Sequence, residues 1–275
     1  VVIKDRRIAT IQTPGGCGAL KIGAELIKKV KGNSTVWVSS PTWANHIPLL
    51  GGAGLKINDY HYYCPVTKRI NKSKMFETLE KASDGDIILV HGCCHNPCGA
   101  DPSYEQWSEL IKLVKEKRLV PMIDFAYQGM GAGLQEDAKG VRALIDQVPE
   151  MIVAVSSSKN IGLYRERAGA VIFLGRDSRT TEAMVSQAIA AARKVYSMPP
   201  AHGSLLAGRV LSSSQLRCNW EEELKLICER INRLRVSFSD ALKANASQDF
   251  SFIAAEKGMF SFLGLSLEQT QRLRS

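Results

Sequence analysis

Apolar and polar residues follow two different periods along the chain. Short apolar runs bounded by small polar residues predict buried β-strands at residues 35–39, 55–59, 86–91, 119–124, 151–156 and 168–174. Between these runs, apolar residues recur at a spacing of three and four, which predicts helices over residues 18–30, 73–82, 104–117, 178–194 and 215–244. This alternation indicates an α/β fold with a mostly parallel central sheet and helices on both faces.

The last helical pattern is the longest and extends over about eight turns. After it, residues 250–253 and 259–262 suggest a β-hairpin around Lys257-Gly258. A helix of this length often links two domains. We therefore expect a large domain over residues 1–219, and a linking helix with the start of a smaller domain over residues 220–275. The pattern contains no internal repeat and no low-complexity segment.

A lysine follows the end of one predicted strand. The stretch AVSSSKNIGLYRERAGA runs from Ala154 to Ala170 and contains Lys159, Arg165 and Arg167. Open α/β sheets bind their ligands at the carboxyl ends of strands. Lys159 is therefore a candidate covalent amine beside an anion site. A solvated basic loop is the alternative, because most lysines lie on the protein surface.

A glycine-rich stretch precedes the first predicted helix. TPGGCGAL, from Thr13 to Leu20, lets the backbone approach an anion at a helix start, where free N–H groups and the helix dipole favour negative charge. It is not a Walker loop, because Leu20 stands at the position of the second glycine. It is not G-x-G-x-x-G either, because Lys21 stands at the last position. A plain turn is the alternative.

Two further predicted strands also end in residues that carry chemistry. Asp124 ends the strand over residues 119–124, and Tyr127 lies three positions later. A carboxylate there needs a cation or a protonated ring nitrogen as its partner, unless it caps a helix. The loop HGCCHNPCG, residues 91–99, offers thiols and imidazoles for zinc through Cys94 and Cys98, but no second ligand pair follows. Its alternative role is a rigid Asn96-Pro97 turn that faces a ligand.

Composition limits the class of protein but does not indicate a particular function. The 275 residues are 45% hydrophobic and 23% charged, which is ordinary for a globular protein. Seven cysteines without the spacing of a secreted scaffold indicate free thiols in a reducing compartment. The net charge of +9 favours anionic ligands, but its lysines and arginines are scattered and lack aromatic interleaving, which argues against nucleic acid. No apolar run is long enough for a membrane span.

These signals together suit one cofactor. The strand ends supply a glycine-rich anion cradle, Trp43 for stacking on a flat ring, Asn96, Asp124 and Lys159. An ordinary buried tryptophan is the alternative for Trp43 taken alone. Pyridoxal phosphate needs a lysine for a Schiff base, an acid for its pyridine nitrogen, and arginine with helix-start donors for its phosphate. The sequence therefore predicts a pyridoxal-phosphate site.

The same stretches resemble the aspartate aminotransferases, a branch of the class I pyridoxal-phosphate-dependent aminotransferases. In chain order they are TPGGCGAL, SSPTWANH, HGCCHNPCG, DFAYQG, SSSKNIGLYRERAG and YSMPPAHG. They cover nearly the whole chain, and HGCCHNP and SKN-GLY-ER are specific to the aspartate and aromatic branch. The resemblance implies the large domain of fold-type I pyridoxal-phosphate-dependent transferases and part of a smaller α/β domain.

The resemblance also implies a role for each site residue. Lys159, Asp124 and Tyr127 are the expected catalytic residues. Lys159 forms the Schiff base and shuttles the proton between the substrate Cα and cofactor C4′. Asp124 keeps the ring nitrogen protonated, and His95 supports Asp124. The expected cofactor-binding residues are Gly15, Gly16, Cys17, Trp43, His95, Asn96, Asp124, Tyr127, Ser156, Lys159 and Arg167. Substrate is expected to contact Trp43, Asn96 and Arg193, the last reaching into the neighbouring subunit's site to pair with the distal carboxylate.

The predicted reaction converts aspartate and 2-oxoglutarate to oxaloacetate and glutamate in a homodimer with shared active sites. The alternative is broader specificity for aspartate and aromatic amino acids, and a non-catalytic pyridoxal-phosphate-binding relative is less favoured. No metal, nucleic acid or membrane partner is expected. A cytoplasmic location is expected, with a mitochondrial or other organellar one as the alternative.

Several positions depart from the family pattern. Cys17 and Cys98 replace threonines, Ser157 replaces a common aromatic residue, and Met198 replaces an asparagine. These changes bear on affinity and specificity rather than on the reaction. The sequence also lacks the family's first segment and the last one, which carries the arginine for the substrate α-carboxylate. We therefore expect the 275-residue piece alone to transaminate poorly, and the full-length protein to be active.

Overall fold

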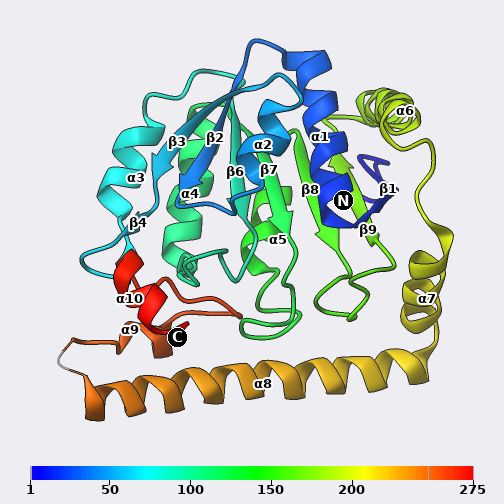
Figure 1. Cartoon of the computed structure of the whole chain (residues 1–275). Coiled ribbons are helices and arrows are strands. Elements are labelled where there is room, and N and C mark those ends of the chain that lie inside the picture. Colours follow the sequence, from blue (N-terminus) through cyan, green and yellow to red (C-terminus); the bar gives the residue numbers. More distant parts are fainter. Residues whose placement is uncertain (1, 247, 275) are drawn as a thin grey trace.

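The computed structural model describes residues 2–246 and 248–274, which form a mixed seven-stranded sheet between two layers of helices (Figure 1). The strands of this sheet are β1 Ile8–Pro14, β2 Thr35–Ser40, β3 Lys56–His61, β6 Ile87–His91, β7 Val120–Phe125, β8 Met151–Ser156 and β9 Ala168–Leu174. Their order is β1-β9-β8-β7-β6-β2-β3. Strands β3, β2, β6, β7 and β8 are parallel to their neighbours in this order, whereas β9 pairs antiparallel with β8 and with β1. A separate two-stranded ribbon joins β4 Tyr63–Cys64 to β5 Arg69–Ile70.

Helices cover both faces of the sheet. They are α1 Gly15–Lys31, α2 His46–Gly51, α3 Lys72–Leu79, α4 Tyr104–Glu116, α5 Lys139–Ile145, α6 Ser178–Val195, α7 Ala201–Ser212, α8 Ser214–Asn245, α9 Phe252–Ala255 and α10 Leu267–Arg272. Alternate residues of the central strands point into opposite layers. In β6, Ile87 and Leu89 pack with α1, α2 and α6, while Ile88 and Val90 pack with α3, α4 and α5. This two-sided burial explains the continuous apolar runs of the sequence.

The carboxyl ends of the parallel strands meet at one edge of the sheet. There the register pairs His91 of β6 with Asp124 of β7, and Asp124 with Ala154 of β8. The end of β7 therefore lies between the loop that follows β6 and the loop that follows β8. The long helix α8 runs across the molecule below this edge (Figure 1). The fold thus brings together chain segments that are far apart in the sequence.

Most of the predicted elements are confirmed. Strands β8 and β9 have the predicted bounds, and the other four predicted strands differ by one or two residues. The first helix begins at Gly15 rather than at residue 18, because side-chain periodicity cannot detect the glycines of its first turn. The pattern missed β1, the small ribbon, and the helices α2, α5, α7 and α10.

The predicted C-terminal hairpin is wrong. Phe252 and Ile253 lie in the short helix α9, where they pack against Leu242 of α8. The segment after α9 pairs with no strand, because its backbone carbonyls accept hydrogen bonds from the buried side chain of Arg235. That guanidinium bonds the carbonyl oxygens of Ile253, Lys257, Gly258 and Phe260 and the hydroxyl of Ser261.

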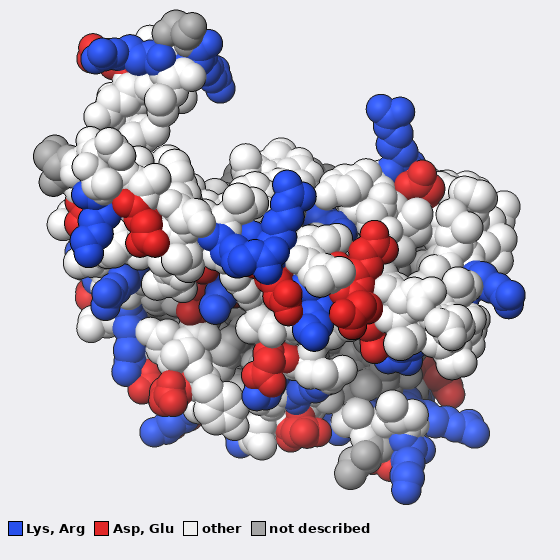
Figure 2. Space-filling model, turned by 90° about the horizontal axis from the view of Figure 1, so that it is seen from below, with Lys and Arg blue, Asp and Glu red and all other residues white. Residues whose placement is uncertain are grey.

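Helix α8 spans 32 residues and runs from α7 to this C-terminal segment (Figure 1). The expected domain boundary at Trp220 falls inside the helix, near its start, and the division into two domains stays a prediction. On the face that α8 occupies, Lys and Arg side chains are interspersed with Asp and Glu (Figure 2). Pairs one helical turn apart, such as Arg217 with Glu221, account for part of this mixture. Among residues 2–246 and 248–274, no helix combines the length and apolar character that crossing a bilayer requires.

Candidate active site

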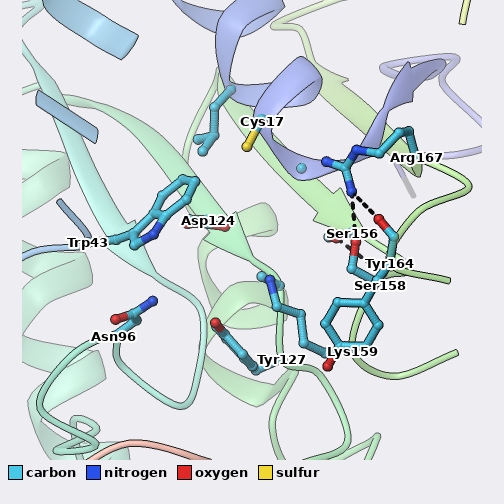
Figure 3. A pocket seen from close by; sticks show the side chains of 13 residues that line it. Cys17, Trp43, Asn96, Asp124, Tyr127, Ser156, Ser158, Lys159, Tyr164 and Arg167 are labelled. Atoms are coloured by element: carbon cyan, nitrogen blue, oxygen red, sulfur yellow. Dashed lines mark hydrogen bonds between the residues drawn. The ribbon is translucent and has the colours of Figure 1, made fainter. Parts of the chain in front are cut away.

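A cavity of about 130 Å³ lies at the carboxyl edge of the sheet, beside the start of α1 (Figure 3). Nine predicted site residues line it: Gly16, Cys17, Trp43, Asn96, Asp124, Tyr127, Ser156, Lys159 and Arg167. Sequence reasoning missed four lining residues, Leu20, Ala126, Ser158 and Tyr164. Of these, Ser158 had a detectable signal, since it lies between two predicted site residues. Gly15, His95 and Arg193 do not line the cavity.

One side of the cavity is built to bind an anion. Helix α1 begins here without a side-chain cap and without an acidic residue in its first turn, so its first N–H groups remain available. Gly15 has φ +70°, and a Cβ at this position would lie 2.5 Å from the Arg167 guanidinium. Glycine therefore lets Arg167 approach the helix start closely. Arg167 Nη1 also donates to Tyr164 O at 2.7 Å and to Ser158 Oγ at 3.4 Å.

A buried carboxylate, Asp124, faces the cavity from the end of β7. Burial raises the pKa of the Asp124 carboxyl, but the hydrogen bond from His46 and the charges of His46 and Lys159 outweigh burial, so this pKa lies below its usual value. His46 Nε2 donates to Asp124 Oδ2 at 3.0 Å. Asp124 is therefore ionised at neutral pH and can hold a proton on a group placed opposite it.

The prediction that His95 supports Asp124 is wrong. His95 bonds Ser39 Oγ at 2.9 Å and Cys98 Sγ at 3.2 Å, and its ring stacks on Tyr62. The partner of Asp124 is His46, the first residue of α2 and fully buried. The physical reason is the packing of three imidazoles: the His91 ring contacts both His46 and His95, and His46 is the one of the two that reaches Asp124. A histidine three residues after Trp43 was the available signal.

A chain of hydrogen bonds continues from His46 into the protein. Thr42 Oγ1 lies 2.7 Å from His46 Nδ1 and 3.3 Å from His91 Nε2. One hydroxyl has one proton, so Thr42 donates to one imidazole and accepts from the other, which couples their tautomers. Burial lowers the pKa of His91 well below its usual value and that of His95 to about 3, so both rings are neutral.

The candidate covalent amine points into the cavity between Asp124 and Tyr127 (Figure 3). Lys159 Nζ lies 4.9 Å from the centroid of the Tyr127 ring. Burial and the nearby charge of Asp124 raise the pKa of Tyr127 to about 12, although a hydrogen bond with Asn96 acts in the opposite direction. The Tyr127 hydroxyl is therefore protonated at neutral pH and can donate a hydrogen bond. Trp43 and Asn96 lie on the opposite side of the cavity.

Two predicted residues differ in their relation to the cavity. Cys17 lines it as the third residue of α1, and its Sγ lies 4.0 Å from Asn45 Nδ2. Arg193 lies at the exposed end of α6, and its Nη1 donates to Ser197 Oγ at 3.1 Å. A role for Arg193 in substrate binding thus requires a cavity other than that of its own subunit.

The cysteine-rich loop is folded around structural hydrogen bonds. Cys98 bonds His95, so the loose pairing of Cys94 with Cys98 does not recur as a ligand pair. Within the described part of the chain, the group spaced for a metal ion consists of Cys93, Cys94 and Asp137. The Asp137 carboxylate, however, accepts three hydrogen bonds, from the backbone N–H groups of Gly129, Gly131 and Ala132. Both carboxylate oxygens of Asp137 therefore bond the backbone of residues 129–132 rather than a metal ion.

Comparison with known proteins agrees with this geometry. Residues 2–275 match the family model described as aminotransferase class I and II, and the chain belongs to this family. It is 46% identical over 274 residues to an aspartate aminotransferase of Escherichia coli, covering 99% of this chain and 69% of that protein. It is 39% identical over 274 residues to an aromatic-amino-acid aminotransferase of Pseudomonas aeruginosa, covering 99% of this chain and 68% of that one.

Solved structures of related enzymes superpose closely on the chain. An aromatic-amino-acid aminotransferase from Burkholderia pseudomallei, covalently bound to pyridoxal phosphate, has a TM-score of 0.97 at 38% identity, with 100% of this chain and 69% of that chain covered. A mitochondrial aspartate aminotransferase from Trypanosoma brucei also has a TM-score of 0.97 at 38% identity, with 100% and 73% covered. The predicted fold class is thereby confirmed.

Proposed function

We propose that the protein is a pyridoxal-phosphate-dependent aspartate aminotransferase, which transfers the amino group of aspartate to 2-oxoglutarate. Family membership and the 46% identity to an aspartate aminotransferase support this reaction. The observation that carries it is the combination, in one cavity, of the Lys159 amine, the ionised Asp124 carboxylate and the anion cradle at Arg167. Pyridoxal phosphate has one group for each of them: its aldehyde for the Lys159 amine, its ring nitrogen for the Asp124 carboxylate, and its phosphate for the cradle at Arg167.

The residues present fit this cofactor. Arg167, Ser156, Ser158 and the first N–H groups of α1 would hold the phosphate, because Gly15 and Gly16 leave room for it. A Cβ at Gly16 would already lie 3.2 Å from Ser156 Cβ, so the cradle tolerates little bulk. Other lining groups would hold the pyridine ring of the cofactor. Trp43 would stack on the face of this ring, Asp124 would contact its nitrogen, and Asn96 and Tyr127 would bond its phenolic oxygen. When bound, pyridoxal phosphate supplies an electron-accepting ring that eases removal of the substrate Cα proton.

The chain's own residues position the reactants and move the proton. Asp124 is ionised and held by His46, so it stabilises a proton on the nitrogen that it faces. Lys159 is the amine in the cavity that faces both Asp124 and Tyr127, so it is suited to take a proton from one carbon and return it to another. Tyr127 keeps its proton and can donate to an oxygen that gains negative charge.

A direct test follows the Lys159 amine in the full-length protein. Added pyridoxal phosphate should give a visible absorbance band, and borohydride should bleach it and fix the added mass on the peptide that contains Lys159. Aspartate and 2-oxoglutarate should then yield oxaloacetate and glutamate, and parallel assays with phenylalanine and tyrosine test the aromatic alternative that the relatives suggest. A protein that forms no such band would exclude this function.

We further propose that two copies of the chain share their active sites through Arg193. The guanidinium is exposed and lies outside its own cavity, and its planar fork suits a substrate carboxylate. Two inactive variants, Lys159→Ala and Arg193→Asp, should regain activity when they are mixed and allowed to exchange subunits. One site of the mixed dimer then has both an intact Lys159 and an intact Arg193 from the neighbour. Persistent inactivity in a proven mixed dimer would show that Arg193 does not serve the neighbouring site.

A further inference from the structure

Helix α8 contacts the loop that carries the reactive lysine. Residue Asn160 directly follows Lys159, and its carbonyl oxygen accepts a hydrogen bond of 2.6 Å from the indole Nε1 of Trp220. Trp220 lies in the second turn of α8, partly buried against the apolar layer formed by α3, α4 and α5. The contact spans 60 residues of sequence and fixes the backbone next to Lys159.

The Asn160 side chain joins this loop to the second catalytic loop. Asn160 Nδ2 donates to the carbonyl oxygen of Gln128 at 3.3 Å, and Gln128 directly follows Tyr127. Gln128 in turn donates from Nε2 to Leu134 O at 2.9 Å. Asn160 therefore sets the spacing between the backbone of Lys159 and the backbone of Tyr127, whose ring lies under the Lys159 amine.

Helix α8 also contacts the loop that follows Tyr127 directly. Gly129 has φ +95°, and a Cβ at this residue would lie 2.5 Å from Leu224 Cδ2. The Leu224 side chain of α8 therefore packs directly against the backbone of Gly129. About two turns further along α8, Asn232 Nδ2 donates to Gly131 O at 3.2 Å. Both catalytic loops are thus attached to the same rigid helix, one through Trp220 and the other through Leu224 and Asn232.

We propose that Trp220 is a positioning residue for Lys159: its indole N–H, acting through Asn160, holds the Lys159 amine in place over Tyr127. This inference rests on the proposed function for the role of the amine. The contact places Trp220 outside the cavity, so it touches neither cofactor nor substrate. Its effect passes through the backbone at Asn160.

The test compares two substitutions that each remove one indole N–H group. Trp220→Phe removes the bond to Asn160, and the matched control Trp37→Phe removes the buried bond of 3.0 Å from Trp37 Nε1 to Asp86 Oδ2, in a different part of the fold. In the cofactor-free protein, hydrogen exchange of the backbone amides of residues 157–163 should become about fivefold faster in Trp220→Phe. The same amides should exchange at the original rate in Trp37→Phe.

A second measurement follows the lysine itself. With pyridoxal phosphate added, Trp220→Phe should shift the pH midpoint of the visible band and lower kcat more than it raises KM for aspartate, and Trp37→Phe should change neither. Unchanged exchange at 157–163 together with an unchanged pH midpoint would overturn the proposal. If Trp220→Phe does not fold, Trp220→Leu takes its place, since it also removes the indole N–H that reaches the Asn160 carbonyl oxygen and should shift the same midpoint. If the unsubstituted protein forms no band, the proposed function fails, but the exchange experiment still tests the contact.

Discussion

Replacing Lys159 by alanine should lower kcat for amino-group transfer by at least about 10⁴-fold, the upper end of what one general acid–base contributes. The loss should be this large because Lys159 serves both as the point of covalent attachment and as the proton carrier. The visible band and the borohydride-stable mass on its peptide should disappear as well. Steady-state kinetics, absorbance and mass spectrometry of the full-length variant check these outcomes.

Lys159→Arg is the matched variant for this prediction, because it keeps a positive charge over the Tyr127 ring but removes the primary amine. It should be as inactive as the alanine variant. Lys139→Ala, at an exposed lysine that pairs with Glu136, should keep full activity. Substantial activity in Lys159→Arg would mean that the charge of this residue, rather than its amine, does the work.

Asp124→Asn should lower kcat by at least about 10³-fold, the scale on which a single preorganised electrostatic group acts. The amide is neutral, so it cannot stabilise a positive charge on the nitrogen opposite it, although it keeps the size of the carboxylate. The absorbance spectrum of the bound cofactor should change in parallel. The control is Asp86→Asn, because Asp86 is a buried carboxylate with three hydrogen bonds to Thr35, Trp37 and Ser83 and none to the cavity. It should lower stability but leave kcat almost unchanged.

Asp124 also predicts a pH dependence of stability. Its pKa in the folded protein lies below the value of about 3.9 expected for the unfolded chain. Its contribution to the free energy of unfolding is therefore fully present above that unfolded value, and it is lost as the pH falls through the lower folded value. The difference in stability between the unsubstituted protein and Asp124→Asn should shrink on acidification below about pH 4. A difference that stays constant down to pH 2 would contradict the assignment.

Much of the site was predictable because the fold places it at strand ends. Lys159 and Asp124 follow continuous apolar runs, and parallel strands bring their carboxyl ends to one edge. Residues on different strands could therefore be assigned to one cavity before any contact was known. The glycines before α1 were informative for the same reason, since they precede a helix at that edge.

The remaining errors concern contacts that periodicity does not encode. His46 and His95 both follow strands, and only the packed structure decides which ring reaches Asp124. Tyr164 lines the cavity from a polar loop, where no pattern distinguishes it from a surface residue. The false hairpin came from two short apolar segments of strand-like composition, whose backbone is instead organised by Arg235. In each case a long-range side-chain contact overrides the local signal.

The burial of β6 on both faces has a consequence for how the sheet is specified. Sliding the strand by one residue would move Ile87 and Leu89 into the opposite layer, where they would still be buried among apolar side chains. Hydrophobicity alone therefore does not penalise such a slip. The polar groups at the strand end do penalise the slip. It would break the pairing of His91 with Asp124 and the hydrogen bond between His91 and Thr42. The residues that perform the chemistry thus also help to choose the correct alignment of the strands that carry them.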